Sequence, residues 1–318
     1  MYPRLSDLFQ DLFGFSLPLP LYSFGLMVAV AILTATWLTK RELDRMYAGG
    51  RVGPIRLREE GRKGRTRWVE TSPSALVWTF MLMAAFFGVL GAKFFHLLEY
   101  PEVFARDPIG AIFSSAGLTI YGGLIVAGLA IGIYANKKGL DWRALCDATA
   151  PGLMLAYGIG RIGCYLAGDG DWGECSDLAE KPAFLPDWLW SETFPRNILD
   201  RDLVAQCGVP YDGVYPTMLY EFAMAAALAG VLWALRKHPY LNGWLFSLYL
   251  VFNGVERFLI EQIRVNVPMF TVGSYEVTQA MFIAVLFVIA GLVGLVLTTK
   301  RREPETPRQA PEPVAAQA

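Results

Sequence analysis

Residues 277–298 read VTQAMFIAVLFVIAGLVGLVLT and contain no charged side chain. A helix needs about 20 mainly apolar residues to cross a hydrocarbon core of about 30 Å, so this stretch can span a bilayer. The whole chain has the same character: of its 318 residues, 54% are hydrophobic and 18% charged, against roughly 25% charged in average soluble chains. The composition predicts a membrane protein. It argues against a soluble enzyme, a disordered regulator or a nucleic-acid-binding protein.

Six further windows meet the same length criterion. They cover residues 19–39, 73–98, 117–135, 144–167, 216–236 and 243–263. The fourth and sixth windows are the least pure: the fourth holds Asp147 and Arg161, and the sixth holds Glu256, Arg257 and Glu261. Such windows cross a membrane only if their charged side chains face the protein interior. The predicted fold class is an all-α polytopic membrane protein with seven transmembrane helices.

Lysine and arginine are unevenly distributed between the loops that join these windows. Nineteen of the 28 lie on one side, ten of them in 40–72; six lie on the other side and three fall within spans. Loops rich in lysine and arginine stay in the cytoplasm. The amino terminus is therefore expected outside the cytoplasm and the carboxyl terminus inside it.

The segments outside the spans differ in composition. Residues 1–18 form an external arm, and 40–72 is a basic cytoplasmic loop, either solvated or bound to anionic lipid. Residues 168–215 hold ten acidic and three basic side chains with many Trp and Pro residues, which predicts a small folded external head. The Pro- and Glu-rich stretch 299–318 is expected to be a disordered cytoplasmic tail.

The four cysteines are scattered along the chain. Cys175 and Cys207 both fall in the predicted head, where an oxidising environment permits a disulfide; two free thiols are the alternative, because spacing does not establish pairing. Cys146 and Cys164 lie in the fourth span as small apolar residues. With two histidines and no C-x-x-C pair, no metal site or cofactor is predicted.

Arginines within two spans are the first functional candidates. Arg161 lies in GIGRIG (158–163), and Arg257 and Glu261 share one helix face with Asn253. Guanidinium groups match phosphate oxygens well, so the pair favours a site for a phospholipid headgroup near the external leaflet. The alternatives are a snorkelling Arg161 and a structural Arg257–Glu261 ion pair.

Other candidates lie at the start of the third and fifth spans. Tyr121 precedes Gly122 and Gly123, which we expect to clear space for a ligand. Tyr220 and Glu221 lie at the start of the fifth span, where an interfacial belt tyrosine is the alternative for Tyr220. Lys93, near the outer end of the second span, is either a snorkelling helix-end group or part of the headgroup site.

Together these segments resemble the prolipoprotein diacylglyceryl transferase family of the bacterial inner membrane. The matching pieces occur in the family's order. They are Gly25-Leu26-Met27, Gly91-Ala92-Lys93, Tyr121-Gly122-Gly123-Leu124-Ile125, Gly160-Arg161-Ile162-Gly163 with Gly168-Asp169, Pro216-Thr217-Met218-Leu219-Tyr220-Glu221, and Glu256-Arg257-Phe258 with Glu261 and Arg264. The resemblance implies transfer of diacylglyceryl from phosphatidylglycerol to the thiol of a lipobox cysteine in prolipoprotein signal peptides, releasing glycerol phosphate. Membrane lipids and these signal peptides are the implied partners.

The resemblance also implies roles for individual residues. Arg161 and Arg257 match the family's functional arginines, with Tyr121 as a third catalytic residue. The substrate-binding positions would be Gly122, Gly123, Asp169, Glu221, Glu261, Tyr220 and Lys93.

The chain departs from the family pattern mainly where protons are handled. Tyr121 replaces a usual histidine, Lys93 an arginine and Asp169 a glutamate. A phenol with a reference pKa near 10 is a poor base at neutral pH, so the departing phosphate, Glu261 or Asp169 are alternative acceptors. Two other functions stay open: a paralogue of the same fold with another lipid or acceptor, and a non-catalytic lipid-binding or transport protein.

Overall fold

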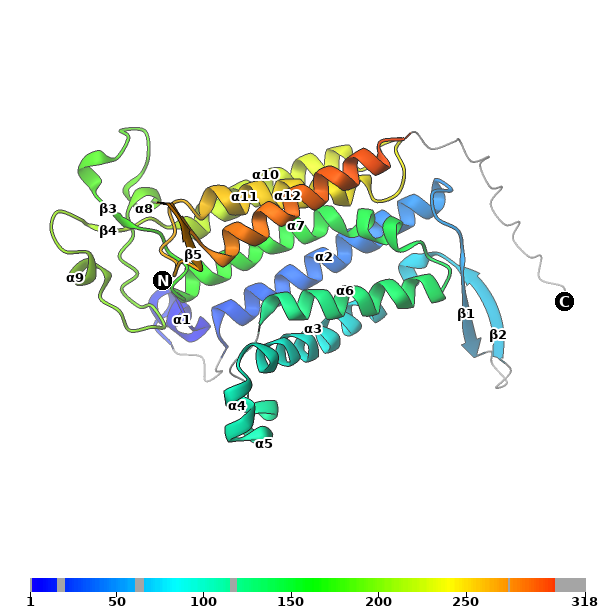
Figure 1. Cartoon of the computed structure of the whole chain (residues 1–318), viewed down its shortest axis with the longest axis horizontal. Helices are drawn as coiled ribbons and strands as arrows, with labels where there is room; N and C mark the ends of the chain where they lie inside the picture. Colours follow the sequence, from blue (N-terminus) through cyan, green and yellow to red (C-terminus); the bar gives the residue numbers. More distant parts are fainter. Residues whose placement is uncertain (1, 16–20, 61–65, 115–118, 274, 301–318) are drawn as a thin grey trace. The chain divides into compact units, whose positions relative to one another are not determined.

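A computed structural model describes residues 2–15, 21–60, 66–114, 119–273 and 275–300 (Figure 1). The described chain divides into two compact units. The first contains residues up to 38 together with residues from 146 onward, and the second contains residues 39–145. Two long helices, α2 (Ser23–Ala48) and α7 (Trp142–Ala167), contribute to both units.

Long apolar helices form most of the first unit. Besides parts of α2 and α7, they are α10 (Thr217–Leu235), α11 (Trp244–Ile260) and α12 (Gln279–Thr298). Figure 1 shows α7, α10, α11 and α12 running side by side. Met154 of α7, Leu232 of α10 and Leu245 of α11 are buried together in one apolar core. This core fixes the positions of the three helices that carry the candidate site.

Small residues allow these helices to approach closely. A side-chain Cβ placed on Gly158 of α7 would lie 3.0 Å from Cβ of Ala225 on α10. On Gly254 of α11 it would lie 2.5 Å from the carbonyl oxygen of Ala284 on α12. A Cβ placed on Gly291 of α12 would lie 2.6 Å from the carbonyl oxygen of Ser247 on α11. The α11–α12 contact therefore depends on glycine at both of its ends.

Residues 168–215 fold into a head whose apolar core also includes Cys164 near the end of α7 and Met218 at the start of α10. The short elements are β3 (Cys175–Ser176), η2 (Leu178–Glu180), α8 (Asp187–Trp190), α9 (Leu203–Cys207) and β4 (Gly213–Val214). Phe194 is fully buried among Trp172, Leu203 and Val214. A disulfide with an S–S distance of 2.01 Å joins Cys175 to Cys207. The segment is thus a compact structure rather than a linker, as its composition indicates.

The second unit contains a helix pair and a β-hairpin. Helices α3 (Val77–Glu99) and α6 (Ile120–Lys137) pack together, and η1 (Pro73–Leu76) leads into α3. The short helices α4 (Pro101–Arg106) and α5 (Pro108–Phe113) follow α3. Strands β1 (Ile55–Glu60) and β2 (Thr66–Thr71) form an antiparallel hairpin in which Ile55 pairs with Thr71.

Within the described residues, four helical stretches are long and apolar enough to cross a membrane. They are Ser23–Ala48, Pro73–Glu99, Thr217–Leu235 and Gln279–Thr298. The three remaining predicted spans fold as α6, α7 and α11, which do not reach that standard. The protein is therefore a mainly helical membrane protein, and a total of seven spans stays a prediction.

Several predicted boundaries need correction. The loop expected over 40–72 is largely regular: α2 continues to Ala48 with Leu43 and Met46 buried, and residues 55–71 contain the hairpin. The arm 1–18 contains the helix α1 (Leu5–Phe13). Strands β5 (Phe270–Val272) and β6 (Tyr275–Val277) form a third small sheet, so the chain is not purely α-helical. The tail from 301 onward and residues 16–18, 61–65, 117 and 118 lie outside the described residues.

Candidate functional site

Glu221, in the first turns of α10, lies at the centre of a cluster of charged side chains. Its side chain is 0% exposed, and a carboxylate buried to this extent needs compensating charges. Arg161 of α7 pairs through Nε with Glu221 Oε2. Two further arginines approach Glu221 Oε1: Arg257 Nη1 at 3.6 Å and Arg264 Nη1 at 3.2 Å. Three guanidinium groups thus converge on one carboxylate.

Two more carboxylates complete the arrangement. Asp171 accepts from Arg161 through Oδ2 and from Arg264 through Oδ1. Glu261 lies 2.8 Å from Arg257 Nη2. We call Arg161, Arg257, Arg264, Asp171, Glu221 and Glu261 the arginine cluster; it contains three groups of each charge.

Neighbouring side chains hold the cluster in place. Glu261 Oε1 accepts hydrogen bonds from Thr278 Oγ1 at 2.6 Å and Asn266 Nδ2 at 2.7 Å. The hydroxyl of Tyr157 donates to Glu221 Oε2 at 2.6 Å. Tyr157 lies one helical turn before Arg161, whose guanidinium carbon is 5.1 Å from the centre of the phenol ring. Arg161 is therefore fixed by two ion pairs and an aromatic face.

A turn after α7 brings Asp171 back onto Arg161. Gly168 and Gly170 have φ angles of 63° and 101°, a backbone region that favours glycine. The hydroxyl of Thr217, at the start of α10, donates to the carbonyl oxygen of Asp171 at 2.6 Å. The short loop 168–171 is thereby anchored to the first turn of α10.

The two aspartates in this loop have opposite pKa shifts. Burial opposes ionisation of Asp171, but the guanidinium groups of Arg264 and Arg161 outweigh it, and its pKa lies below the ordinary value. Burial raises the pKa of Asp169, and the neighbouring Asp171 charge raises it further. Asp171 is therefore a fixed negative charge, whereas Asp169 is the better proton acceptor.

Two residues that are neighbours in sequence, Glu256 and Arg257, carry buried polar atoms without a hydrogen bond. Neither carboxyl oxygen of Glu256, which is 2% exposed, has a hydrogen-bond partner among the described residues, and the same holds for Nη1 of Arg257. Buried polar atoms without hydrogen bonds are uncommon and call for an explanation, such as a ligand or a catalytic role. Arg257 Nη1 is a donor that a bound anion could use.

Four of the residues selected from sequence come together in the arginine cluster: Arg161, Arg257, Glu221 and Glu261. The selection did not include Tyr157 or Asp171, and it named Arg264 only within the matching motif, without a role. Arg264 continues the polar face of the sixth predicted span, so its position was a usable signal. Asp171 offered a weaker signal, as an acid near the glycines that follow α7. Tyr157 gave none, because its partner Glu221 lies 64 residues away in the sequence.

Asp169 and Tyr220 lie close to the cluster in sequence but are not members of it. Asp169 accepts a weak hydrogen bond from the backbone N–H of Asp171 at 3.4 Å and lies beside the Cys164 thiol. Tyr220 donates its hydroxyl to the carbonyl oxygen of Leu189 in the head, at 2.6 Å. That bond connects α10 to the head, and the substrate-binding role of Tyr220 stays a prediction.

The remaining candidates belong to the second unit. Tyr121 and Lys93 are half-buried, on α6 and α3. The space beside Gly122 and Gly123 is filled by α3: a Cβ on Gly122 would lie 2.3 Å from Cβ of Phe95, and one on Gly123 2.7 Å from a backbone oxygen of α3. The expectation that these glycines clear room for a ligand is therefore wrong. They allow two helices to pack.

Three side chains near the end of α7, those of Cys164, Asp169 and Asp171, resemble a metal-binding group. Ligand atoms of Cys164, Asp169 and Asp171 lie within 4.8 Å of one another. Both oxygens of Asp171 are engaged by arginines, however, so this set of three does not present a free set of metal ligands. The chemistry of the site is that of guanidinium and carboxylate groups.

Comparison with known proteins agrees with this chemistry. The sequence profile of the family described as prolipoprotein diacylglyceryl transferase matches residues 11–297. A phosphatidylglycerol--prolipoprotein diacylglyceryl transferase of Bacillus cereus (strain Q1) is 27% identical over 286 residues, covering 89% of this chain and 90% of the relative. An enzyme of the same name from Bacillus cytotoxicus is 27% identical over 274 residues, covering 85% and 86%. Since the match extends over nearly the whole sequence, the chain belongs to the prolipoprotein diacylglyceryl transferase family.

Proposed function

We propose that this protein transfers the diacylglyceryl group of phosphatidylglycerol to the cysteine thiol of a prolipoprotein lipobox, releasing glycerol phosphate. The relatives carry this donor and this acceptor in their names. The observation that carries the proposal is the convergence of Arg161, Arg257 and Arg264 on Glu221. Such a group of guanidiniums suits a substrate whose reacting end is a phosphodiester.

The arginines would act on the phosphate at two stages. In the bound state Arg257 Nη1, which has no hydrogen bond among the described residues, donates to a phosphate oxygen. As the reaction proceeds, the cysteine sulfur forms a bond to the glycerol carbon, and the bond from that carbon to the phosphate oxygen breaks. The electron pair leaves with glycerol phosphate, and Arg161 and Arg257 stabilise the added negative charge.

The proton of the cysteine thiol needs an acceptor, because the thiolate is the nucleophile. The departing phosphate can take it directly. Asp169 is a second acceptor, since burial raises the pKa of its carboxyl group, as described above.

Tyr121 stands where the family usually has a histidine, and we propose that it contributes to catalysis from that position. Replacing Tyr121 with His should retain or raise the rate of transfer, whereas Tyr121→Phe should lower it. Equal rates for wild type, Tyr121→His and Tyr121→Phe would remove Tyr121 from the mechanism.

The arrangement in the membrane is also part of the proposal. We infer seven spans in a bacterial inner membrane, with the amino terminus and the head 168–215 in the periplasm and the carboxyl terminus in the cytoplasm. The charge imbalance of the loops supports this orientation. It places the arginine cluster near the outer leaflet, on the side of the head.

The test is a transfer assay in proteoliposomes that contain phosphatidylglycerol and a lipobox peptide. A mass gain of one diacylglyceryl unit on the peptide cysteine is expected. Arg257→Ala should reduce the rate by about 10²- to 10³-fold, the usual loss when one stabilising donor is removed. Arg257→Lys should recover only part of the rate, because lysine lacks the planar donor fork.

Arg196→Ala is the matched control. Arg196 lies in the head and pairs with Asp11 at 2.7 Å, outside the cluster, so its removal should leave the rate near that of wild type. Equal rates for Arg257→Ala and wild type would overturn the role of Arg257. Lipid transport without any lipid turnover would overturn the proposed reaction.

A further inference from the structure

Glu256 of α11 is a buried carboxyl group to which the proposed reaction gives no role. It is 2% exposed, and neither of its carboxyl oxygens makes a hydrogen bond among the described residues, although the phenol of Tyr157 lies beside it. Buried polar atoms are nearly always hydrogen-bonded, and an exception calls for a ligand or a catalytic role. Arg257, the next residue, carries a second such exception at Nη1. Unsatisfied groups on two consecutive residues suggest one ligand that both contact.

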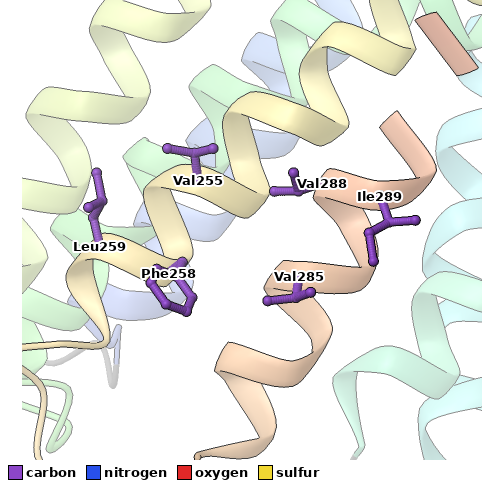
Figure 2. Close-up of a pocket in the computed structure, with 6 residues that line it drawn as sticks. All are labelled: Val255, Phe258, Leu259, Val285, Val288 and Ile289. Carbon is purple, nitrogen blue, oxygen red and sulfur yellow. The ribbon is translucent and has the colours of Figure 1, made fainter. Parts of the chain in front are cut away.

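The side of α11 that carries Glu256 faces α7 and α10. Tyr249 and Phe252 precede Glu256 by seven and four residues, so the three side chains share one helix face. Tyr249 and Phe252 pack against the apolar core that α7, α10 and α11 form together. Val255 and Phe258 lie elsewhere around the helix and line an apolar pocket with residues of α12 (Figure 2). The carboxyl group of Glu256 is therefore directed toward α7 and α10 rather than toward α12.

Within the described residues, the charged and titratable groups around Glu256 come from the three helices of that core. They are Tyr157 and Arg161 of α7, Glu221 of α10, and Tyr249 and Arg257 of α11. Helix α12 contains no titratable side chain. Tyr157, Arg161 and Glu221 also act on the charge of Arg257. Because they share these neighbours, the carboxyl group of Glu256 and the guanidinium of Arg257 border the same part of the arginine cluster.

The charge balance of the arginine cluster determines which form of Glu256 suits a lipid substrate. The cluster contains three groups of each charge, and Glu256 is a further carboxyl group outside that balance. Its ionised form would be a buried negative charge without hydrogen bonds, which is strongly disfavoured, and it would repel an incoming phosphodiester. Its protonated form adds no charge, and the O–H group is a hydrogen-bond donor. Only the protonated form therefore favours a bound phosphate.

We propose that Glu256, in its protonated form, donates a hydrogen bond to the phosphate of the lipid substrate, beside the bond from Arg257 Nη1. This inference rests on the proposed function, because that function brings a phosphodiester to the arginine cluster. The proton stays on Glu256, and no covalent bond forms or breaks there. Lipid binding and protonation of Glu256 are consequently coupled: the lipid binds best while Glu256 is protonated, and affinity falls as rising pH ionises it.

The experiment measures binding of the lipid alone. Full-length protein in detergent is titrated with short-chain phosphatidylglycerol by isothermal calorimetry, between about pH 6 and about pH 9.5. Buffers of different ionisation enthalpy are compared, so that the heat reports proton uptake. Wild type should take up as much as about one proton per lipid at the alkaline end, because binding restores the protonated form of Glu256. Its Kd should rise by up to about tenfold per pH unit once Glu256 ionises.

Two substitutions separate the proton of Glu256 from the shape of its side chain. Glu256→Gln keeps an N–H donor but does not ionise, so its Kd near neutral pH should stay within about threefold of wild type. Both the proton uptake and the weaker binding at alkaline pH should disappear. Glu256→Met has no donor and should raise the Kd about tenfold at every pH, as expected for the loss of one hydrogen bond to a charged group.

Glu102→Gln is the matched control. Glu102 is exposed on α4, so its replacement should leave the Kd and the proton uptake at their wild-type values. Proton uptake by Glu256→Gln equal to that of wild type would overturn the proposal. So would wild-type affinity in a folded Glu256→Met protein; if its melting temperature shows that this variant does not fold, the Glu256→Gln titration decides alone.

The titration contains no peptide, so its result is separate from that of the transfer assay. Proton-coupled binding without any lipidated peptide would reject the proposed function and leave the role of Glu256 standing. Peptide lipidation without proton-coupled binding would support the proposed function and reject the role of Glu256.

Discussion

Asp171 and Asp169 lie two residues apart and respond to pH in opposite ways. Asp171 has a pKa below the ordinary value, so it stabilises the fold at neutral pH, and this contribution is lost as pH falls through the lowered pKa. Asp171→Asn should therefore lower the free energy of unfolding at pH 7 by roughly 2 kcal/mol. The difference from wild type should shrink below about pH 4. Thermal denaturation in detergent across pH 3–8 checks this.

Asp169→Asn provides the comparison. Because the pKa of Asp169 is raised, its ionised form costs stability above its ordinary pKa, and that cost disappears as pH falls. The variant should be as stable as wild type at pH 7, or more stable. A loss of stability equal to that of Asp171→Asn would contradict the assigned shifts.

Glu221 and Glu256 form a second informative pair, since both are buried glutamates. Glu221→Gln removes the negative charge that faces three arginines and should lower the free energy of unfolding by about 3–5 kcal/mol. Glu256→Gln keeps the shape of the side chain beside Tyr157 and cannot carry a buried charge, so it should change stability by less than about 1 kcal/mol, or increase it. Melting temperatures of the two variants, measured in the same detergent, distinguish them.

The sequence identified the arginines more readily than their partners. Arg161, Arg257 and Glu261 are charges within apolar windows, where each is costly and therefore conspicuous. Asp171 could not be singled out among the ten acids of 168–215, because its role depends on a turn that reverses the chain after α7. Tyr157 depends on a contact with Glu221, 64 residues away, that no local pattern encodes.

At the scale of elements, glycines decide how the helices pack. Gly254→Ala would place a Cβ 2.5 Å from a backbone oxygen of α12, and the backbone cannot move aside cheaply. We expect a loss of about 1–3 kcal/mol. Gly230→Ala on α10 is the control, since nothing lies within 4 Å of its added methyl group; alanine should stabilise that helix by up to about 1 kcal/mol. Equal melting temperatures for both variants would argue against the close α11–α12 contact.

The long helices could be predicted from sequence because their apolar windows have a single physical explanation. The hairpin β1–β2 could not be predicted from the sequence, because many of its residues are charged. Its strands IRLREE and TRWVET alternate polar and apolar residues in part, but the ten basic residues of 40–72 favoured a loop. The extension of α2 to Ala48 was missed for the same reason: Leu43 and Met46 are buried on a helix that otherwise carries charges.

At the scale of the whole molecule, the proposed orientation can be tested with single cysteines. Phe184 in the head is 84% exposed and Trp68 in the hairpin is 67% exposed. In a variant with Cys146 and Cys164 changed to Ser, an impermeant maleimide should label Phe184→Cys in intact spheroplasts. Trp68→Cys should react only after the membrane is permeabilised, because the basic segments are expected in the cytoplasm. Labelling of both in intact cells would reject the topology.

Contacts near both ends of α7 connect it to α11. Asp147 accepts hydrogen bonds from the backbone N–H groups of Gly243 and Phe246, both at 2.9 Å, and so caps the start of α11. Fourteen residues later, roughly 21 Å along the axis, Arg161 meets Arg257 through Glu221. Two such anchor points prevent one helix from sliding along the other. The spacing of these two guanidiniums is therefore set before any substrate arrives, and a bulky lipidated product must escape by motion elsewhere in the protein.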